Sequence, residues 1–258
     1  MSSSRDDAIT NVGGNVANEI DRRQFIATTA AALSVAKVPL QTPAAAASSK
    51  RKVVLFQGDS ITDCGRNRTA ADANSAGALG TGYPLLVTSG VLAARPTEGL
   101  EFYNRGISGN KVPDLQQRWT TDTLDLKPDV LSILIGVNDF WHKLDHGYTG
   151  TVKDYEDQYT ALLQQTRQAI PNLQLIVLEP FVLRTGAVDA RWFPEFDERR
   201  AAAARVAAGA RAAFVPLQTV FNEKARVAPP QYWAADGVHP TAAGHAVIAE
   251  QWRRAAHL

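Results

Sequence analysis

From Lys52 onward, short apolar runs rich in β-branched residues alternate with longer amphipathic segments. The apolar runs are continuous, which is typical of strands that are buried on both faces of a parallel sheet. Five runs have this character: 53–56, 101–104, 130–135, 173–178 and 213–217. The pattern therefore predicts an α/β fold in which helices cover both faces of a five-stranded parallel sheet.

Five amphipathic segments between and after these runs predict helices over 84–94, 114–120, 152–170, 195–212 and 242–256. In the third segment, large side chains recur every three or four residues and would share one helix face: Val152, Tyr155, Tyr159, Leu162, Leu163, Thr166 and Ile170. Thr151 and Asp154 have the spacing of a capping box. This face is expected to pack in the core.

No linker or repeat divides residues 48–258, so the sequence predicts one domain there. The polar stretch 64–82 is longer than an ordinary connection and is interpreted as a functional rim or a mobile loop. The carboxyl ends of the parallel strands lie at one edge of the sheet, where open α/β sheets bind ligands. Functional residues are therefore expected just after the strands.

The first 47 residues have the order of an export signal. A polar lead is followed by Arg22 and Arg23, a weakly apolar stretch over 25–38 and small residues over 43–47. Paired arginines before Phe25 resemble the twin-arginine class, with cleavage expected near Ala46 or Ala47. This predicts export to the periplasm or the extracellular space; the alternative is a tail in which two arginines are adjacent by chance.

Composition and charge narrow the classes further. The chain has 258 residues, 45% of them hydrophobic and 21% charged, and residues 51–258 carry 22 Lys and Arg against 22 Asp and Glu. A neutral body argues against nucleic-acid binding. Cys64 is the only cysteine, and no zinc-type array of Cys and His is present. No apolar run reaches the roughly 18 residues needed to span a bilayer, so no membrane embedding of the mature domain is expected.

Four polar clusters stand where the chemistry is expected. They are Gly58-Asp59-Ser60-Ile61-Thr62, Asn104-Arg105-Gly106-Ile107-Ser108-Gly109-Asn110, Gly136-Val137-Asn138-Asp139 and Asp236-Gly237-Val238-His239-Pro240. Three of them directly follow predicted strands. In this order along the chain, the four clusters resemble the sequence blocks of the SGNH, or GDSL-type, esterase and lipase family. The resemblance implies a three-layer α/β/α sandwich of the flavodoxin-like kind, and a serine hydrolase that needs no cofactor and no metal.

The resemblance also implies a role for each cluster. Ser60 is the expected nucleophile, His239 the base that activates it, and Asp236 the carboxylate that orients the imidazole. The expected oxyanion hole consists of the backbone N–H groups of Ser60 and Gly106 and the side-chain amide of Asn138. Asp59 is interpreted differently, as a structural residue that binds backbone N–H groups in the turn.

Longer strings extend these blocks, and they look like the branch that contains bacterial acetylxylan esterases and related carbohydrate deacetylases. They are 58–66, 104–110, Asp114-Leu115, Arg118-Trp119, and 135–139 with Trp141. A small-molecule or polysaccharide ester is the expected substrate, hydrolysed through an acyl-enzyme. Trp141, Tyr232, Trp233 and Asp139 are the candidate substrate-binding residues. The stretch 64–82 contains no strongly apolar insertion that could form a lipase lid, which favours short acyl chains. The sequence leaves open whether the chain forms a homo-oligomer.

Three alternatives remain at this point. A lysophospholipase or thioesterase of the same family would differ in acyl-chain preference. A metallophosphoesterase would use the carboxylates and His239 as ligands, although that class needs more histidines than the clusters supply. A non-catalytic carbohydrate-binding domain could keep the fold and lose turnover.

Overall fold

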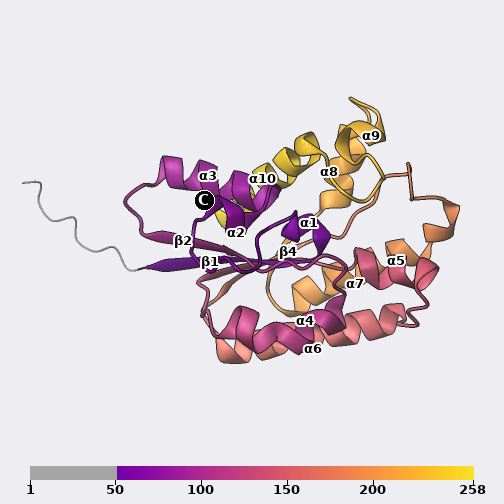
Figure 1. The fold of residues 1–258 in the computed structure, drawn as a ribbon. Coiled ribbons are helices and arrows are strands. Elements are labelled where there is room, and N and C mark those ends of the chain that lie inside the picture. The colour runs from indigo at the N-terminus through magenta and orange to yellow at the C-terminus, as the bar shows by residue number, and fades with distance from the viewer. Residues whose placement is uncertain (1–50) are drawn as a thin grey trace, which may run out of the picture. The chain divides into compact units, whose positions relative to one another are not determined.

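The computed structural model describes residues 51–258, and its centre is a five-stranded parallel sheet (Figure 1). The strands are β1 (Lys52–Gly58), β2 (Leu100–Asn104), β3 (Val130–Leu134), β4 (Gln174–Leu178) and β5 (Ala213–Val215). Their spatial order is β2-β1-β3-β4-β5, and every neighbouring pair is parallel. The predicted α/β fold is confirmed. The proposed signal over 1–47 lies outside the described residues.

Both faces of the sheet are covered, as the continuous apolar runs require. All five residues of β3 are buried, and successive residues of β1 pack into different cores. Val54 and Phe56 belong to one hydrophobic cluster, while Leu55 between them belongs to the other. This arrangement follows from the alternation of side chains along a strand. The sheet is therefore the middle layer of three.

Two groups of helices form the outer layers (Figure 1). The cluster that contains Val54 also includes buried residues of α3 (Tyr83–Ala94), α8 (Leu217–Lys224) and α10 (Ala242–Ala256). The cluster that contains Leu55 includes buried residues of α4 (Val112–Trp119), α6 (Val152–Ala169) and α7 (Glu195–Gly209). All five helices predicted from the sequence are present.

Helix α6 begins as its sequence predicts. The Thr151 hydroxyl accepts the Asp154 backbone N–H at 3.1 Å, and an Asp154 carboxylate oxygen accepts the Thr151 backbone N–H at 2.9 Å. These two bonds satisfy donors that have no partner inside the helix. The predicted stripe faces the core: Tyr155, Tyr159, Leu162, Leu163 and Thr166 are buried.

Several elements were not predicted. They are α1 (Ser60–Asp63), α2 (Ala76–Leu79), α5 (Val137–Asp145), α8, α9 (Pro230–Trp233), a π-helical turn η1 (Thr120–Leu124) and a 3₁₀ turn η2 (Ala190–Trp192). Of these, α5 matters most for function because it begins directly after β3. It is helical because Val137, Phe140, Trp141 and Leu144 share one face and pack against the core.

The stretch 64–82 is packed against the edge of the sheet. Leu79 of α2 is 1% exposed, so part of this segment belongs to the core. Asn74 binds the outer side of β2 through three hydrogen bonds. Its side chain donates to the Leu100 carbonyl and accepts the Phe102 N–H, and its own N–H donates to the Phe102 carbonyl. The segment is therefore long because it packs along the edge of the sheet, and its length does not require a mobile loop.

The strand order places a topological switch point between β1 and β3. From β1 the chain moves to β2 on one side and then crosses back to β3 on the other, so the loops after β1 and β3 diverge. A crevice at such a point is where doubly wound sheets bind ligands. Among residues 51–258, no helix is both long and apolar enough to cross a membrane.

Candidate active site

Ser60 begins the short helix α1, directly after β1. The turn needs Gly58, because its φ is +155° and a Cβ there would lie 2.3 Å from the Leu134 carbonyl oxygen. Asp59 caps the helix: its Oδ1 accepts the Ile61 N–H at 3.0 Å. Asp59 is 1% exposed, and burial raises its pKa to about 7. The interpretation of Asp59 as structural agrees with these contacts.

Asp236 and His239 lie on a short loop between α9 and α10. The Asp236 Oδ1 atom accepts the backbone N–H groups of Val238 at 2.9 Å and of His239 at 2.7 Å. The Leu183 N–H donates to the Gly237 carbonyl at 2.8 Å and fixes the loop to the segment after β4. The loop therefore holds both side chains before substrate arrives.

Ser60, His239 and Asp236 form a continuous chain of hydrogen bonds. Ser60 Oγ lies 2.8 Å from His239 Nε2, and His239 Nδ1 lies 2.6 Å from Asp236 Oδ2. Although burial alone raises the pKa of Asp236, hydrogen bonds from His239 and Val238 outweigh burial and hold this pKa below its usual value. The carboxylate thus stays ionised beside the imidazole, as a serine nucleophile with a histidine base requires.

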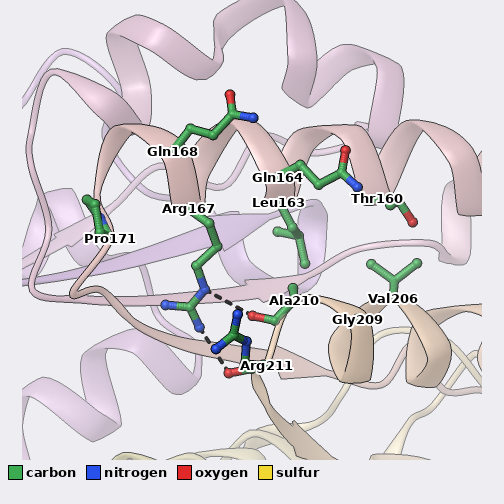
Figure 2. A pocket seen from close by; sticks show the side chains of 10 residues that line it. All are labelled: Thr160, Leu163, Gln164, Arg167, Gln168, Pro171, Val206, Gly209, Ala210 and Arg211. Carbon is green, nitrogen blue, oxygen red and sulfur yellow. Dashed lines mark hydrogen bonds between the residues drawn. The ribbon is translucent and has the colours of Figure 1, made fainter.

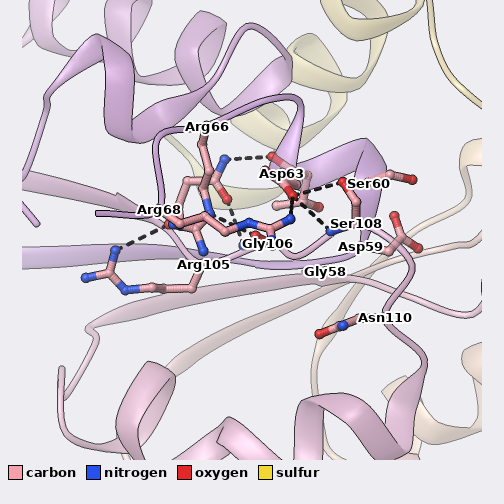
Figure 3. A network of polar contacts seen from close by, with 12 residues as sticks. Gly58, Asp59, Ser60, Asp63, Arg66, Arg68, Arg105, Gly106, Ser108 and Asn110 are labelled. Carbon is pink, nitrogen blue, oxygen red and sulfur yellow. Dashed lines mark hydrogen bonds and ion pairs between the residues drawn. The ribbon is translucent and has the colours of Figure 1, made fainter. Parts of the chain in front are cut away.

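The loop of residues 105–110, called the 105–110 loop below, lies beside α1 (Figure 3). The Ile107 N–H donates to the Gly58 carbonyl at 3.0 Å. Asp63 Oδ2 accepts both the N–H and the hydroxyl of Ser108 at 2.9 Å. Arg66 Nε donates to the Gly106 carbonyl at 2.8 Å. These bonds fix the loop against the segment that carries Ser60.

Gly106 does not supply an oxyanion donor in this arrangement, contrary to the expectation. Its N–H donates to Asn104 Oδ1 at 2.9 Å, and a Cβ on Gly106 would lie 2.5 Å from the Asp63 nitrogen. The glycine is therefore required for close packing against α1. The sequence contained a signal for this bond, because an asparagine side chain commonly accepts the N–H two residues later in an Asx turn.

Gly109 is the better candidate within the same loop. It has φ +82°, and nothing closer than a His142 ring carbon at 3.8 Å would meet a Cβ there. Among the hydrogen bonds of residues 51–258, neither the Gly109 N–H nor the Ser60 N–H donates to a protein acceptor. Both are thus available to a developing oxyanion.

Asn138 and Asp139, adjacent in α5, have different surroundings. Asn138 Nδ2 donates to the Asn110 carbonyl at 3.1 Å, which orients the amide and leaves its second hydrogen free. Asp139 is 0% exposed, and its Oδ1 accepts the Val112 N–H at 3.2 Å. Burial raises the pKa of Asp139 to about 7, and its Oδ2 has no hydrogen-bond partner. The prediction that Asp139 binds substrate is wrong, because substrate cannot reach a fully buried carboxyl group.

The three aromatic candidates are placed unequally. The Trp141 ring lies 5.9 Å from the His239 ring, and its indole N–H donates to Asp145. Trp233 donates its indole N–H to the Ala228 carbonyl and packs against the core, while Tyr232 is 56% exposed. Among residues 51–258 only Trp141 has an aromatic contact with the triad. The roles of Tyr232 and Trp233 stay predictions.

A groove on the surface lies apart from this site. A groove of about 580 Å³ between α6 and α7 is lined by residues such as Leu163, Arg167 and Val206 (Figure 2). None of its lining residues belongs to the triad or to the 105–110 loop.

Within the described part of the chain, no group of three or more His, Cys, Asp or Glu side chains is arranged to hold a metal ion.

Comparisons with known proteins agree with this geometry. Residues 56–247 match the model of the GDSL-like lipase/acylhydrolase family. The chain is 37% identical over 205 residues to an acetylxylan esterase of Geobacillus stearothermophilus, an alignment that covers 78% of this chain and 92% of that protein. A crystal structure assigned as a GDSL-like lipase from Parabacteroides merdae has a TM-score of 0.79 at 47% identity, covering 81% of this chain and 97% of that one.

The crystal structure of Axe2, an acetylxylan esterase from G. stearothermophilus, matches with a TM-score of 0.73 at 34% identity, covering 82% of this chain and 96% of that one. Three further Axe2 structures are described as catalytic mutants, in which a serine, an aspartate and a histidine are changed. In Axe2 the histidine follows that serine by 179 residues and the aspartate by 3, the same separations as in the Ser60, Asp236 and His239 set. The chain belongs to the GDSL-like lipase/acylhydrolase family and is a carboxylic ester hydrolase.

Proposed function

We propose that the chain removes acetyl groups from an esterified carbohydrate, with Ser60 as nucleophile, His239 as general base and Asp236 as the residue that orients it. The observation that carries the proposal is the hydrogen-bonded chain from Ser60 Oγ through His239 to Asp236. Its support from outside the structure is the similarity to acetylxylan esterases, including the spacing of the residues changed in the catalytic mutants.

The reaction has two steps. Ser60 Oγ attacks the ester carbonyl carbon while its proton passes to His239 Nε2, and a tetrahedral intermediate with a negative oxygen forms. The intermediate collapses, the sugar hydroxyl leaves with the proton from His239, and acetyl-Ser60 remains. Water then loses a proton to His239 and attacks the acetyl carbonyl. Acetate leaves, and Ser60 recovers its proton.

The negative oxygen needs donors that are in place before the reaction. We assign this role to the N–H groups of Ser60 and Gly109 and to the free amide hydrogen of Asn138. Donors that point at the developing charge act more strongly on the transition state than on the ester ground state, and therefore raise kcat.

A preference for short acyl chains is supported by the surface. In the described part of the chain only three large hydrophobic residues are exposed: Leu86, Val227 and Tyr232. Enzymes that bind long acyl chains need a contiguous apolar surface or groove for the chain. An acetyl group needs none.

The test is acetate release from a panel of acetylated xylo-oligosaccharides, together with a series of p-nitrophenyl esters of increasing chain length. We expect release from the oligosaccharides, highest rates with the acetate ester and no turnover by Ser60→Ala. A preference for long acyl chains would instead favour a lysophospholipase or thioesterase. Undiminished hydrolysis by Ser60→Ala would refute the mechanism.

A further inference from the structure

Arg118, in the last turn of α4, makes hydrogen bonds in three directions at the base of the active site. Its Nε donates to Asn110 Oδ1 at 2.8 Å, and its Nη1 donates to the Arg105 carbonyl at 2.7 Å. Nη2 makes a longer bond of 3.5 Å to the Gly58 carbonyl. The side chain is 15% exposed, so most of this guanidinium is shielded from water.

These acceptors mark particular places in the chain. Arg105 and Asn110 are the first and last residues of the 105–110 loop, and Gly58 precedes the nucleophile turn. Among residues 51–258, Arg118 is the only side chain that hydrogen-bonds both ends of this loop. The two ends are thereby held around one planar group, and Gly109 lies on the segment between them.

Arg118 is itself held in place from the other side. Its Nη1 also pairs with Asp122 Oδ2 at 2.8 Å, across the junction between α4 and η1. The Asp122 carbonyl accepts the side-chain amide of Gln57, a fully buried residue of β1. Next to Arg118, Trp119 is buried and donates its indole N–H to Thr166 of α6. The guanidinium is thus fixed to the sheet and to the helical layer beneath it.

We propose that Arg118 is a positioning residue for catalysis, which holds the 105–110 loop so that the Gly109 N–H and, through the Asn110 carbonyl, the Asn138 amide point at the oxyanion. This inference rests on the proposed function and adds a residue to it. Because the acceptors lie in three directions around the guanidinium, a lysine ammonium cannot replace it: one nitrogen cannot occupy the positions of Nε and Nη1 at once.

The variant Arg118→Gln removes the guanidinium and keeps a polar side chain. We expect kcat for p-nitrophenyl acetate to fall about 10- to 100-fold, since small displacements of catalytic groups have effects of this size. KM should change little, because the oxyanion donors act mainly in the transition state. Arg118→Lys should also lose kcat.

The chain offers a matched control in Arg167 of α6 (Figure 2). Its guanidinium likewise ties separate segments together, through the backbone carbonyls of Ala210, Leu173 and Arg211, but it lies beside the groove between α6 and α7. Arg167→Gln should lower the melting temperature and leave kcat unchanged. If Arg118 only stabilised the fold, the two variants would behave alike.

A double-mutant cycle with Asn138→Ala separates positioning from general destabilisation. If Arg118 acts through the oxyanion donors, Arg118→Gln should lose less activity in the Asn138→Ala background than alone. The proposal is overturned if the two effects on kcat multiply, or if folded Arg118→Gln or Arg118→Lys has the kcat of the wild type. Where Arg118→Gln fails to fold, Arg118→Lys carries the cycle. Activity in Ser60→Ala would refute the proposed function instead, so the two failures differ.

Discussion

The side-chain amide of Asn138 donates to the backbone carbonyl of Asn110 at 3.1 Å, and this bond joins α5 to the 105–110 loop. The bond uses one hydrogen of the amide and fixes the direction of the other. Asn138→Ala removes that second donor together with the bond to the Asn110 carbonyl. We expect a loss of about 3 to 4 kcal/mol in transition-state stabilisation, or about 10²- to 10³-fold in kcat. Steady-state kinetics on p-nitrophenyl acetate measure it; near-normal turnover would remove Asn138 from the oxyanion hole.

Asp236 has two functions that a single substitution separates. In Asp236→Asn the remaining carbonyl oxygen can still accept the N–H groups of Val238 and His239, so the loop should keep its shape. The amide cannot stabilise a protonated His239 as the carboxylate does. We expect kcat to fall by about 10⁴-fold, as in other serine hydrolase triads, with little change in the melting temperature. A variant that unfolds, or one that keeps its activity, would contradict this division.

Asp139 should make stability depend on pH. Its pKa in the folded protein is about 7, because of burial, against an ordinary value of 3.8. Between these values the folded form holds a proton that the unfolded chain has released, so the free energy of unfolding falls as the pH rises. Asp139→Asn cannot lose this proton. We expect its melting temperature to improve relative to the wild type as the pH rises from about 4.5 to about 7.5.

The comparison with the wild type is needed because His245 titrates with the opposite sign. Burial, helped by the neighbouring His239, lowers the pKa of His245 to about 4 from its ordinary 6.5. The unfolded chain therefore binds the extra proton, and this contribution to stability rises with pH. The difference between Asp139→Asn and the wild type removes the contribution of His245 from the comparison. If the melting temperatures of Asp139→Asn and the wild type differ by the same amount at every pH, Asp139 does not titrate in this range.

Trp141 should affect large substrates more than small ones. Its ring is 5.9 Å from the His239 ring and partly buried, so it can form one wall beside the nucleophile. Trp141→Ala should raise KM for acetylated xylo-oligosaccharides more than for p-nitrophenyl acetate, because a sugar ring loses a stacking surface. Equal changes in KM for both substrates would argue against a sugar contact at Trp141.

The amino-terminal segment predicts a processing event. Secreted material should begin just after Ala46 or Ala47, and replacing Arg22 and Arg23 by lysine should hold the precursor in the cell. Mass spectrometry of the intact secreted protein measures the new terminus. Secreted protein that begins at Met1 would refute the signal.

Strands β1, β3 and β4 could be predicted closely because they are buried on both faces and therefore have continuous apolar runs, whereas the edge strands β2 and β5 are only partly buried. Helix α5 is not predicted from the sequence, because the polar residues at its start conceal its apolar face. Its first turn carries the polar residues Asn138 and Asp139, whereas Val137, Phe140, Trp141 and Leu144 around them have helical spacing. A functional cluster at a helix start can thus conceal the periodicity that follows.

The triad could be predicted from the resemblance of the four polar clusters to the family's sequence blocks, and the structure brings its three side chains together. The oxyanion glycine could not be settled in the same way, because Gly106 and Gly109 lie in one short loop with similar neighbours. The choice depends on where each N–H points, and the side chain of Asn104 takes the first of them. The position of the Arg118 side chain depends on the junction between α4 and the π-helical turn η1. The hydrophobic pattern of the sequence does not predict this junction.

Asn74 affects whether copies of the protein can associate through the edge of the sheet. β2 is the edge strand of a parallel sheet, and an uncovered edge can recruit a strand from another molecule. The Asn74 side chain and backbone together occupy the Leu100 and Phe102 groups that such a strand would use. Asn74 thus occupies the place that a further strand would take next to β2. Even at high protein concentration, copies of the enzyme should not associate edge to edge through β2.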